Sequence, residues 1–254
     1  MPSNLPKINM FWHGGKLGPV HSACMRSFLR HGHKVVLHCY EAPADLPAGV
    51  ETFDAEQIMP RSDLVANKAT GSVALGANRY RYRLMRHGMG VYADCDMFCL
   101  QPIPDADYIF GWEDARKINN AILKYPRDSA LADMLEEKTK TEYYIPDNSS
   151  RRRKYLLRIR HAFGLGVSVR HMRWGVWGPQ LLTDQIRTLK LENKAQPIDR
   201  FYPLHYFNTS LLFEKGLRIE DLVTRRTLTI HLSNKMLDKR PPPANSPLDQ
   251  IINS

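Results

Sequence analysis

The fold is decided by the stretch GMGVYADCD at residues 88–96. Its glycines stop the helical pattern that precedes them, and Val91, Tyr92 and Ala93 then predict a short buried strand. This strand runs directly into Asp94 and Asp96. In open α/β sheets, ligands bind beyond the carboxyl ends of the strands. The sequence therefore predicts a binding site at this pair of acids.

The first forty residues predict the same class of fold. An apolar strand at 8–12 is followed by a helical pattern at 21–30 and a second apolar strand at 34–40. A strand, a helix and a strand in that order indicate a right-handed βαβ unit and a parallel sheet.

The rest of the chain continues the alternation of helices and strands. Further elements are predicted at 72–87, 97–100, 108–112, 121–123, 129–138, 180–190 and 227–232. We expect one α/β domain over residues 1–254, with a mixed, mostly parallel central sheet. An irregular helical lobe is expected at about 140–175, and a tail at about 240–254.

Composition narrows the class of protein. The chain has 254 residues, 43% hydrophobic and 24% charged, which is ordinary for a globular protein with its own core. Its formal net charge of +10 favours anionic partners. Four cysteines without metal spacing, and the lack of a signal pattern or a long apolar run, indicate a cytoplasmic protein without a disulfide framework.

Two carboxylates one residue apart have a specific chemical use. Hard divalent cations such as Mg²⁺ and Mn²⁺ take one or two carboxylate oxygens from the protein and complete their shell with phosphate oxygens. A cation held in this way stabilises the charge on a departing diphosphate. Asp94 and Asp96 therefore predict a metal site that serves a nucleotide-diphosphate ligand.

The surroundings of this pair resemble a known enzyme family. The run NRYRY at 78–82 and the run GVYADCD at 90–96 resemble the glycosyltransferases with the DXD sugar-binding motif, which include yeast-type α-mannosyltransferases, α-1,4-galactosyltransferases and many bacterial enzymes. The match falls on Asn78, Arg81, Gly90, Val91, Tyr92, Asp94 and Asp96. Asn78 stands where the family usually has Asp, and Met89 where it usually has Gly.

Three other segments resemble the same family. The first is the opening strand at 8–14, the second is GPQLLT at 178–183, and the third is HLSNK at 231–235, where Ser233 replaces a usual Trp. The resemblance implies a GT-A-like fold, a UDP- or GDP-sugar donor and a Mn²⁺ or Mg²⁺ cofactor. It also implies hexosyl transfer with retention to a glycan or lipid-linked acceptor, as in bacterial polysaccharide biosynthesis.

The resemblance also implies roles for individual residues. Asp96 would coordinate the metal directly, with His231 as a further ligand, and Asp94 would contact the donor sugar and the metal through water. The expected substrate-binding residues are Trp12, His13, Asn78, Arg81, Tyr92, Asn119, Asn120, Asp184, Asn234 and Lys235. For Arg81, an ion pair that fixes Asp94 is the alternative. Packing or turn roles are the alternatives for the aromatic residues and for the Asn pair.

A basic run, RRRKYLLRIRH, occupies residues 151–161. Its cations are interleaved with apolar side chains, which indicates peripheral contact with the inner face of a membrane. A solvated loop is the alternative. We expect no nucleic-acid partner, because no recognition motif accompanies the charge. The alternative to an enzyme is a non-catalytic nucleotide-sugar or glycan-binding protein of the same fold.

Overall fold

The computed structural model describes residues 5–147, 149–172, 175–237 and 240–254. Its central sheet has the strand order β3-β2-β1-β4-β7-β6. The parallel strands are β1 (Ile8–Trp12), β2 (Val35–Cys39), β3 (Glu51–Asp54) and β4 (Val91–Ala93). Antiparallel to β4 lies β7 (Ile118–Lys124), followed by β6 (Ile109–Trp112). The predicted α/β class and the mixed, mostly parallel sheet are confirmed.

A second, two-stranded sheet joins β5 (Met97–Cys99) to β8 (Thr229–His231) in antiparallel pairing. The α-helices are α1 (Pro19–Arg30), α2 (Ala74–Arg86), α3 (Ala130–Thr139), α4 (Arg151–Ala162), α5 (Leu181–Thr188), α6 (Ile198–Phe201) and α7 (Pro247–Ile252). Strand β3 was not predicted, because three of its four side chains are exposed and its sequence lacks an apolar pattern. Of the lobe expected at 140–175, residues 148, 173 and 174 lie outside the described residues.

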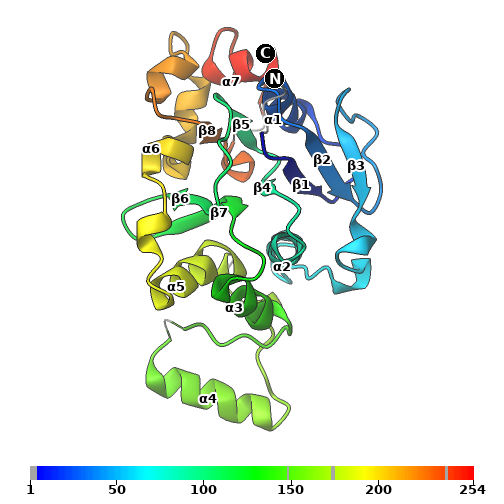
Figure 1. Ribbon diagram of the computed structural model, residues 1–254, viewed down its shortest axis with the longest axis vertical. Coiled ribbons are helices and arrows are strands. Elements are labelled where there is room, and N and C mark those ends of the chain that lie inside the picture. Colours follow the sequence, from blue (N-terminus) through cyan, green and yellow to red (C-terminus); the bar gives the residue numbers. More distant parts are fainter. Residues whose placement is uncertain (1–4, 148, 173–174, 238–239) are drawn as a thin grey trace.

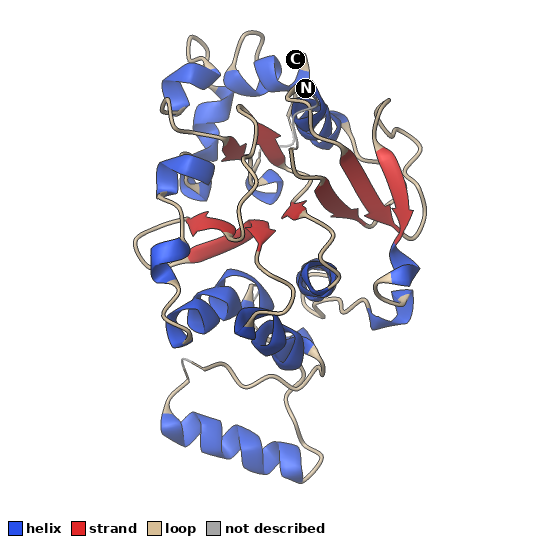
Figure 2. Cartoon of the chain, in the orientation of Figure 1, coloured by secondary structure: helices blue, strands red, loops and turns tan. Residues whose placement is uncertain are grey.

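The two faces of the sheet are covered by different helices. Along β1, Ile8 and Met10 enter the core beneath α1, whereas Phe11 points to the core formed by α2, α3 and α5. Strand β4 alternates in the same way, as a period of two requires. In Figure 2 helices lie above the strands, along their left side and below them, and α4 stands apart at the lower end of the molecule in Figure 1.

None of the helices in the described part of the chain has the length and apolar character that crossing a bilayer requires. All four cysteines are buried and free.

The approach to β4 requires a glycine. Gly90 has a φ of 112°, and a Cβ atom built on it would lie 2.7 Å from the backbone oxygen of Lys7. A side chain here is therefore both strained and in contact with the backbone of the residue that precedes β1. Gly90 lets β4 pass close enough to pair with β1. It thereby places Asp94 at the carboxyl end of this central strand.

We predict that Gly90→Ala lowers the free energy of unfolding by about 1–3 kcal/mol, because it adds backbone strain and a clash with main-chain atoms. Gly15→Ala is the matched control, since a Cβ there meets nothing within 4 Å. Urea unfolding of both variants provides the measurement. Equal stability of the two variants would contradict the requirement at Gly90.

Candidate functional site

The two aspartates and His231 are brought together by the turn between β4 and β5. The Asp94 backbone N–H donates to the oxygen of Ala121 on β7 at 2.7 Å, and Met97 N–H closes the turn on the oxygen of Asp94 at 3.0 Å. Strand β8 then pairs with β5 so that His231 stands opposite Met97. A residue from the end of the chain thus lies beside a motif more than a hundred residues earlier.

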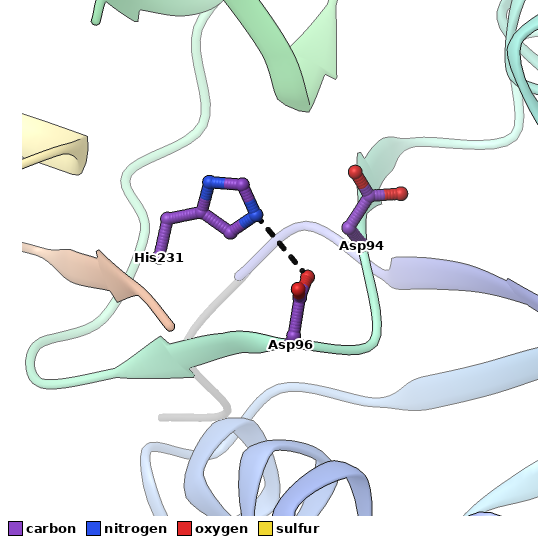
Figure 3. Close-up of side chains that lie close together, drawn as sticks. All are labelled: Asp94, Asp96 and His231. Atoms are coloured by element: carbon purple, nitrogen blue, oxygen red, sulfur yellow. Dashed lines mark ion pairs between the residues drawn. The ribbon is translucent and has the colours of Figure 1, made fainter. Parts of the chain in front are cut away.

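One ligand atom from each of Asp94, Asp96 and His231 can be chosen so that all three lie within 4.8 Å of one another. His231 Nε2 is 3.3 Å from Asp96 Oδ1, and Figure 3 shows Asp94 beside this pair. All three side chains are partly exposed, between 16% and 27%. The site is therefore open to a ligand from solvent.

Asp94 is held by a buried guanidinium. Arg81 donates from both terminal nitrogens to the two oxygens of Asp94, at 2.8 and 3.2 Å, and also to the backbone oxygen of Asn120. Burial alone would lower the pKa of Arg81, but the negative charge of Asp94 outweighs it and the pKa is raised. Arg81 therefore stays charged and fixes the Asp94 carboxylate in one orientation.

Tyr92 completes the support of Asp94. Its hydroxyl donates to Asp94 Oδ1 at 2.7 Å, and Arg81 lies over its ring, 4.5 Å from the centroid. Burial raises the pKa of Tyr92, so the hydroxyl keeps the proton that it donates. Oδ1 accepts two hydrogen bonds and Oδ2 accepts one, from Arg81. Oδ2 thus retains the capacity to accept another donor.

Asp96 carries a stable negative charge. Burial alone would raise the pKa of Asp96, but the attraction and hydrogen bond of His231 and the Asn234 N–H, which donates at 2.9 Å, lower it well below its usual range. Burial lowers the pKa of His231 as well, yet Asp96 outweighs that effect and raises it. The charge of Asp96 therefore favours the protonated form of His231.

These three side chains fit a divalent cation. Two carboxylates and one imidazole match the oxygen and nitrogen donors that Mg²⁺ and Mn²⁺ accept. Neighbouring ligands in an octahedral shell lie about 3 Å apart, close to the 3.3 Å between His231 and Asp96. Because imidazole binds metal only when it is neutral, a cation would take the place of the His231 proton.

The neighbourhood of the cluster includes one residue that the sequence analysis missed. His21, near the start of α1, contacts the Asn234 amide at 3.2 Å through Nε2, while its Nδ1 lies 2.6 Å from the oxygen of Leu17. The Trp12 ring lies 4.6 Å from the His21 ring. The position of His21, at the start of the helix that follows β1, is the feature of the sequence that could have identified it.

Two other predicted site residues, Lys235 and His13, differ in their surroundings. Lys235 donates to the Ser72 hydroxyl at 2.6 Å, and burial lowers its pKa despite the attraction of Asp94 and Asp96. His13 is exposed, with its ring 6.3 Å from that of Tyr40.

Asn78 and Asn120 lie in the interior. Both are buried, and the Asn120 amide donates to Asn78 Oδ1 at 2.8 Å and to the Tyr82 hydroxyl at 3.2 Å. Tyr82 in turn donates to the backbone oxygen of Trp177 at 2.7 Å. Since the oxygen of Asn120 also accepts from Arg81, this network supports the guanidinium that holds Asp94.

Asn119 and Asp184 have their own partners. The Asn119 amide donates to Glu113 at 3.0 Å and its oxygen accepts from the Ala121 N–H at 2.8 Å. Glu113, which the sequence analysis also missed, contributes to the raised pKa of His231. Asp184 accepts from Gln180 on the same turn of helix, and burial raises its pKa.

No protein-family model matches the sequence, and no curated protein matches it significantly. Among solved structures, the chain is similar to the PaToxG glycosyltransferase, with a TM-score of 0.48 and 10% sequence identity over 72% of this chain and 71% of that chain. Similarity at this level does not identify a reaction.

We predict that Tyr92→Phe lowers the free energy of unfolding by about 1–2 kcal/mol, because Asp94 loses a charge-assisted hydrogen bond. Tyr125→Phe is the matched control: it removes a buried hydroxyl of the same core that has no hydrogen-bond partner among the described residues. Chemical unfolding of both variants should show a loss for Tyr92→Phe alone. An equal loss in both would mean that the Asp94 contact contributes nothing.

Proposed function

We propose that this chain is a metal-dependent glycosyltransferase. It moves a hexosyl group from a UDP- or GDP-sugar to a glycan or lipid-linked acceptor, with retention of configuration. The observation that carries the proposal is the cluster of Asp94, Asp96 and His231 at the carboxyl end of β4, in the part of an α/β sheet where ligands bind. The resemblance of residues 78–96 to the DXD-motif enzymes supplies the reaction.

Asp96 and His231 are the residues that would hold the cation, with Asp94 beside them. When bound, Mn²⁺ or Mg²⁺ would supply Lewis-acid stabilisation of the charge that develops on the departing diphosphate. Lys235 adds a positive charge near the two aspartates. Their attraction opposes the lowering of the Lys235 pKa by burial. The net charge of +10 further favours an anionic donor.

Asp94 has a separate task in this proposal. Because Arg81 and Tyr92 fix its carboxylate and Oδ2 retains acceptor capacity, it can bind a hydroxyl of the donor ribose or sugar. Such a fixed acceptor orients the sugar without an entropic cost at the moment of reaction. We assign contact with the nucleotide base to Trp12 and His13, at the end of β1.

Retention is assigned to substitution on one face of the sugar. The acceptor hydroxyl oxygen forms a bond to the anomeric carbon on the face from which the diphosphate oxygen departs. The acceptor proton passes to that departing oxygen, so that atoms and charge balance. This route requires no carboxylate nucleophile, unlike the covalent route of many retaining hydrolases.

The metal site gives the first test. We expect Mn²⁺ to raise the unfolding midpoint of the protein, by an amount equivalent to about 2.7 kcal/mol at a hundredfold excess over Kd. Asp96→Asn should abolish the shift, because it removes the carboxylate that would bind the ion directly. Asp107→Asn, an exposed acid on a loop, is the matched control. Thermal unfolding with and without Mn²⁺ measures both, and an undiminished shift in Asp96→Asn would exclude this site.

The reaction itself gives the second test. UDP- and GDP-hexoses are incubated with Mn²⁺ and a panel of acceptors, and release of nucleoside diphosphate is followed. We expect turnover that chelator abolishes and that Asp96→Asn lowers at least about a hundredfold, since Lewis-acid stabilisation contributes several kcal/mol. The configuration of the product, read by NMR, tests retention. Donor binding without turnover would instead favour the non-catalytic alternative.

A further inference from the structure

Helix α4 is a helix without a core. All 12 of its residues lie in the described part of the chain, and none of them is buried. In Figure 1 it stands at one end of the molecule beyond α3 and α5, joined to the body by two connecting segments. A helix without a fully buried side chain gains little from tertiary packing, so its exposed surface needs another explanation.

The composition of α4 is one-sided in charge. Residues 151–163 contain six Lys or Arg residues and His161, and no Asp or Glu. The same segment exposes large apolar side chains: Tyr155 at 65%, Leu156 at 53%, Ile159 at 36% and Phe163 at 77%. Isolated apolar residues are common on protein surfaces, but four on one helix and its cap form a patch.

These four side chains share one side of the helix. They fall at i, i+1, i+4 and i+8, which at 3.6 residues per turn is an arc of about 100°. Lys154 and Leu157 lie outside this arc and are half-buried, so the side of α4 nearest the body is a different one. The outward face, defined by Tyr155, Leu156, Ile159 and Phe163, is therefore turned to solvent.

Arginines border this outward face. On the same helical spacing, Arg152 falls within the arc, and Arg153 and Arg160 lie along one margin. All three are exposed. Their long side chains can extend from an apolar layer to negative groups above it. A stripe of apolar side chains among arginines is the pattern of a helix that lies in the head-group region of an anionic bilayer.

We propose that the outward face of α4 docks on an anionic lipid membrane, with the helix parallel to the surface. The charge and the apolar side chains of this face favour a membrane over a second copy of the chain or a nucleic acid. A second copy of the chain would bring the same uncompensated cations together, which would repel. A nucleic acid would satisfy the arginines but leave Tyr155, Leu156, Ile159 and Phe163 in water. A bilayer with negative head groups satisfies both sets of side chains. The proposal does not depend on the transfer reaction.

Sedimentation of the full chain with lipid vesicles tests the proposal. We expect binding to phosphatidylcholine vesicles that contain phosphatidylglycerol, and at least tenfold weaker binding to pure phosphatidylcholine. Arg152→Glu/Arg160→Glu should weaken binding at least tenfold, since each cation near the surface contributes about fivefold. Ile159→Asp should weaken it as well, because it places a charge in the apolar stripe.

Lys215→Glu/Arg225→Glu is the matched control. It reverses two exposed charges far along the chain from α4 and changes the net charge by the same amount. If it weakens binding as much as the α4 pair, overall charge rather than this face is responsible and the proposal is wrong. It is equally wrong if vesicles are not bound, or if α4 variants lose affinity for a duplex oligonucleotide or lose self-association instead.

A label reports the orientation of the helix. Because the four native cysteines are buried, Ile159→Cys and Arg158→Cys can each be labelled with a polarity-sensitive dye. On anionic vesicles, emission should shift to shorter wavelength for the label at 159, and much less for the label at 158, which lies off the stripe. Equal shifts at both positions would contradict docking through this face.

Discussion

The ion pair between Arg81 and Asp94 is the constraint on which the site depends. It joins the middle of α2 to the end of β4, two elements that also meet through the guanidinium of Arg81 over the Tyr92 ring and through apolar packing. A buried arginine without its carboxylate would be an uncompensated charge, which is strongly destabilising. The same pairing that secures the helix against the sheet therefore fixes the orientation of Asp94. One ion pair therefore contributes both to the stability of the protein and to the geometry of the site, and replacing either Arg81 or Asp94 would impair both.

The sequence predicted the elements of the fold well where the pattern was strong. The strand that ends at Asp94 and the first βαβ unit have clear apolar runs bounded by glycine or polar residues, and the structure confirms them. Strand β3 has the sequence Glu-Thr-Phe-Asp and is mostly exposed, so no burial pattern marks it as an edge strand. Helix α4 lies in a segment that was expected to be an irregular helical lobe, and its basic run was interpreted as a peripheral membrane contact, with a solvated loop as the alternative. The helical stripe among its charges becomes visible only once its outward side is known.

The candidate site was predictable in part for the same kind of reason. Asp94 and Asp96 follow a strand directly, so local sequence places them. The family resemblance, and not a local pattern, suggested His231 as a ligand. Its position depends on the pairing of β5 with β8, which no local pattern specifies. His21 was missed because its contact with Asn234 joins the two ends of the chain. Long-range pairings of this kind are set by tertiary packing, and a single sequence carries little information about them.

The network behind Arg81 also gives a physical account of Asn78, which stands where the DXD-motif enzymes usually have an aspartate. Asn78 accepts from Asn120, and the backbone oxygen of Asn120 accepts from Arg81, so position 78 is two hydrogen bonds from the guanidinium. Gly178 leaves room for it, because a Cβ there would lie 3.1 Å from the Asn78 amide. A neutral amide fits this buried position without bringing a second negative charge toward Arg81. The positive charge of Arg81 is then committed to Asp94, and the interior remains neutral around the pair.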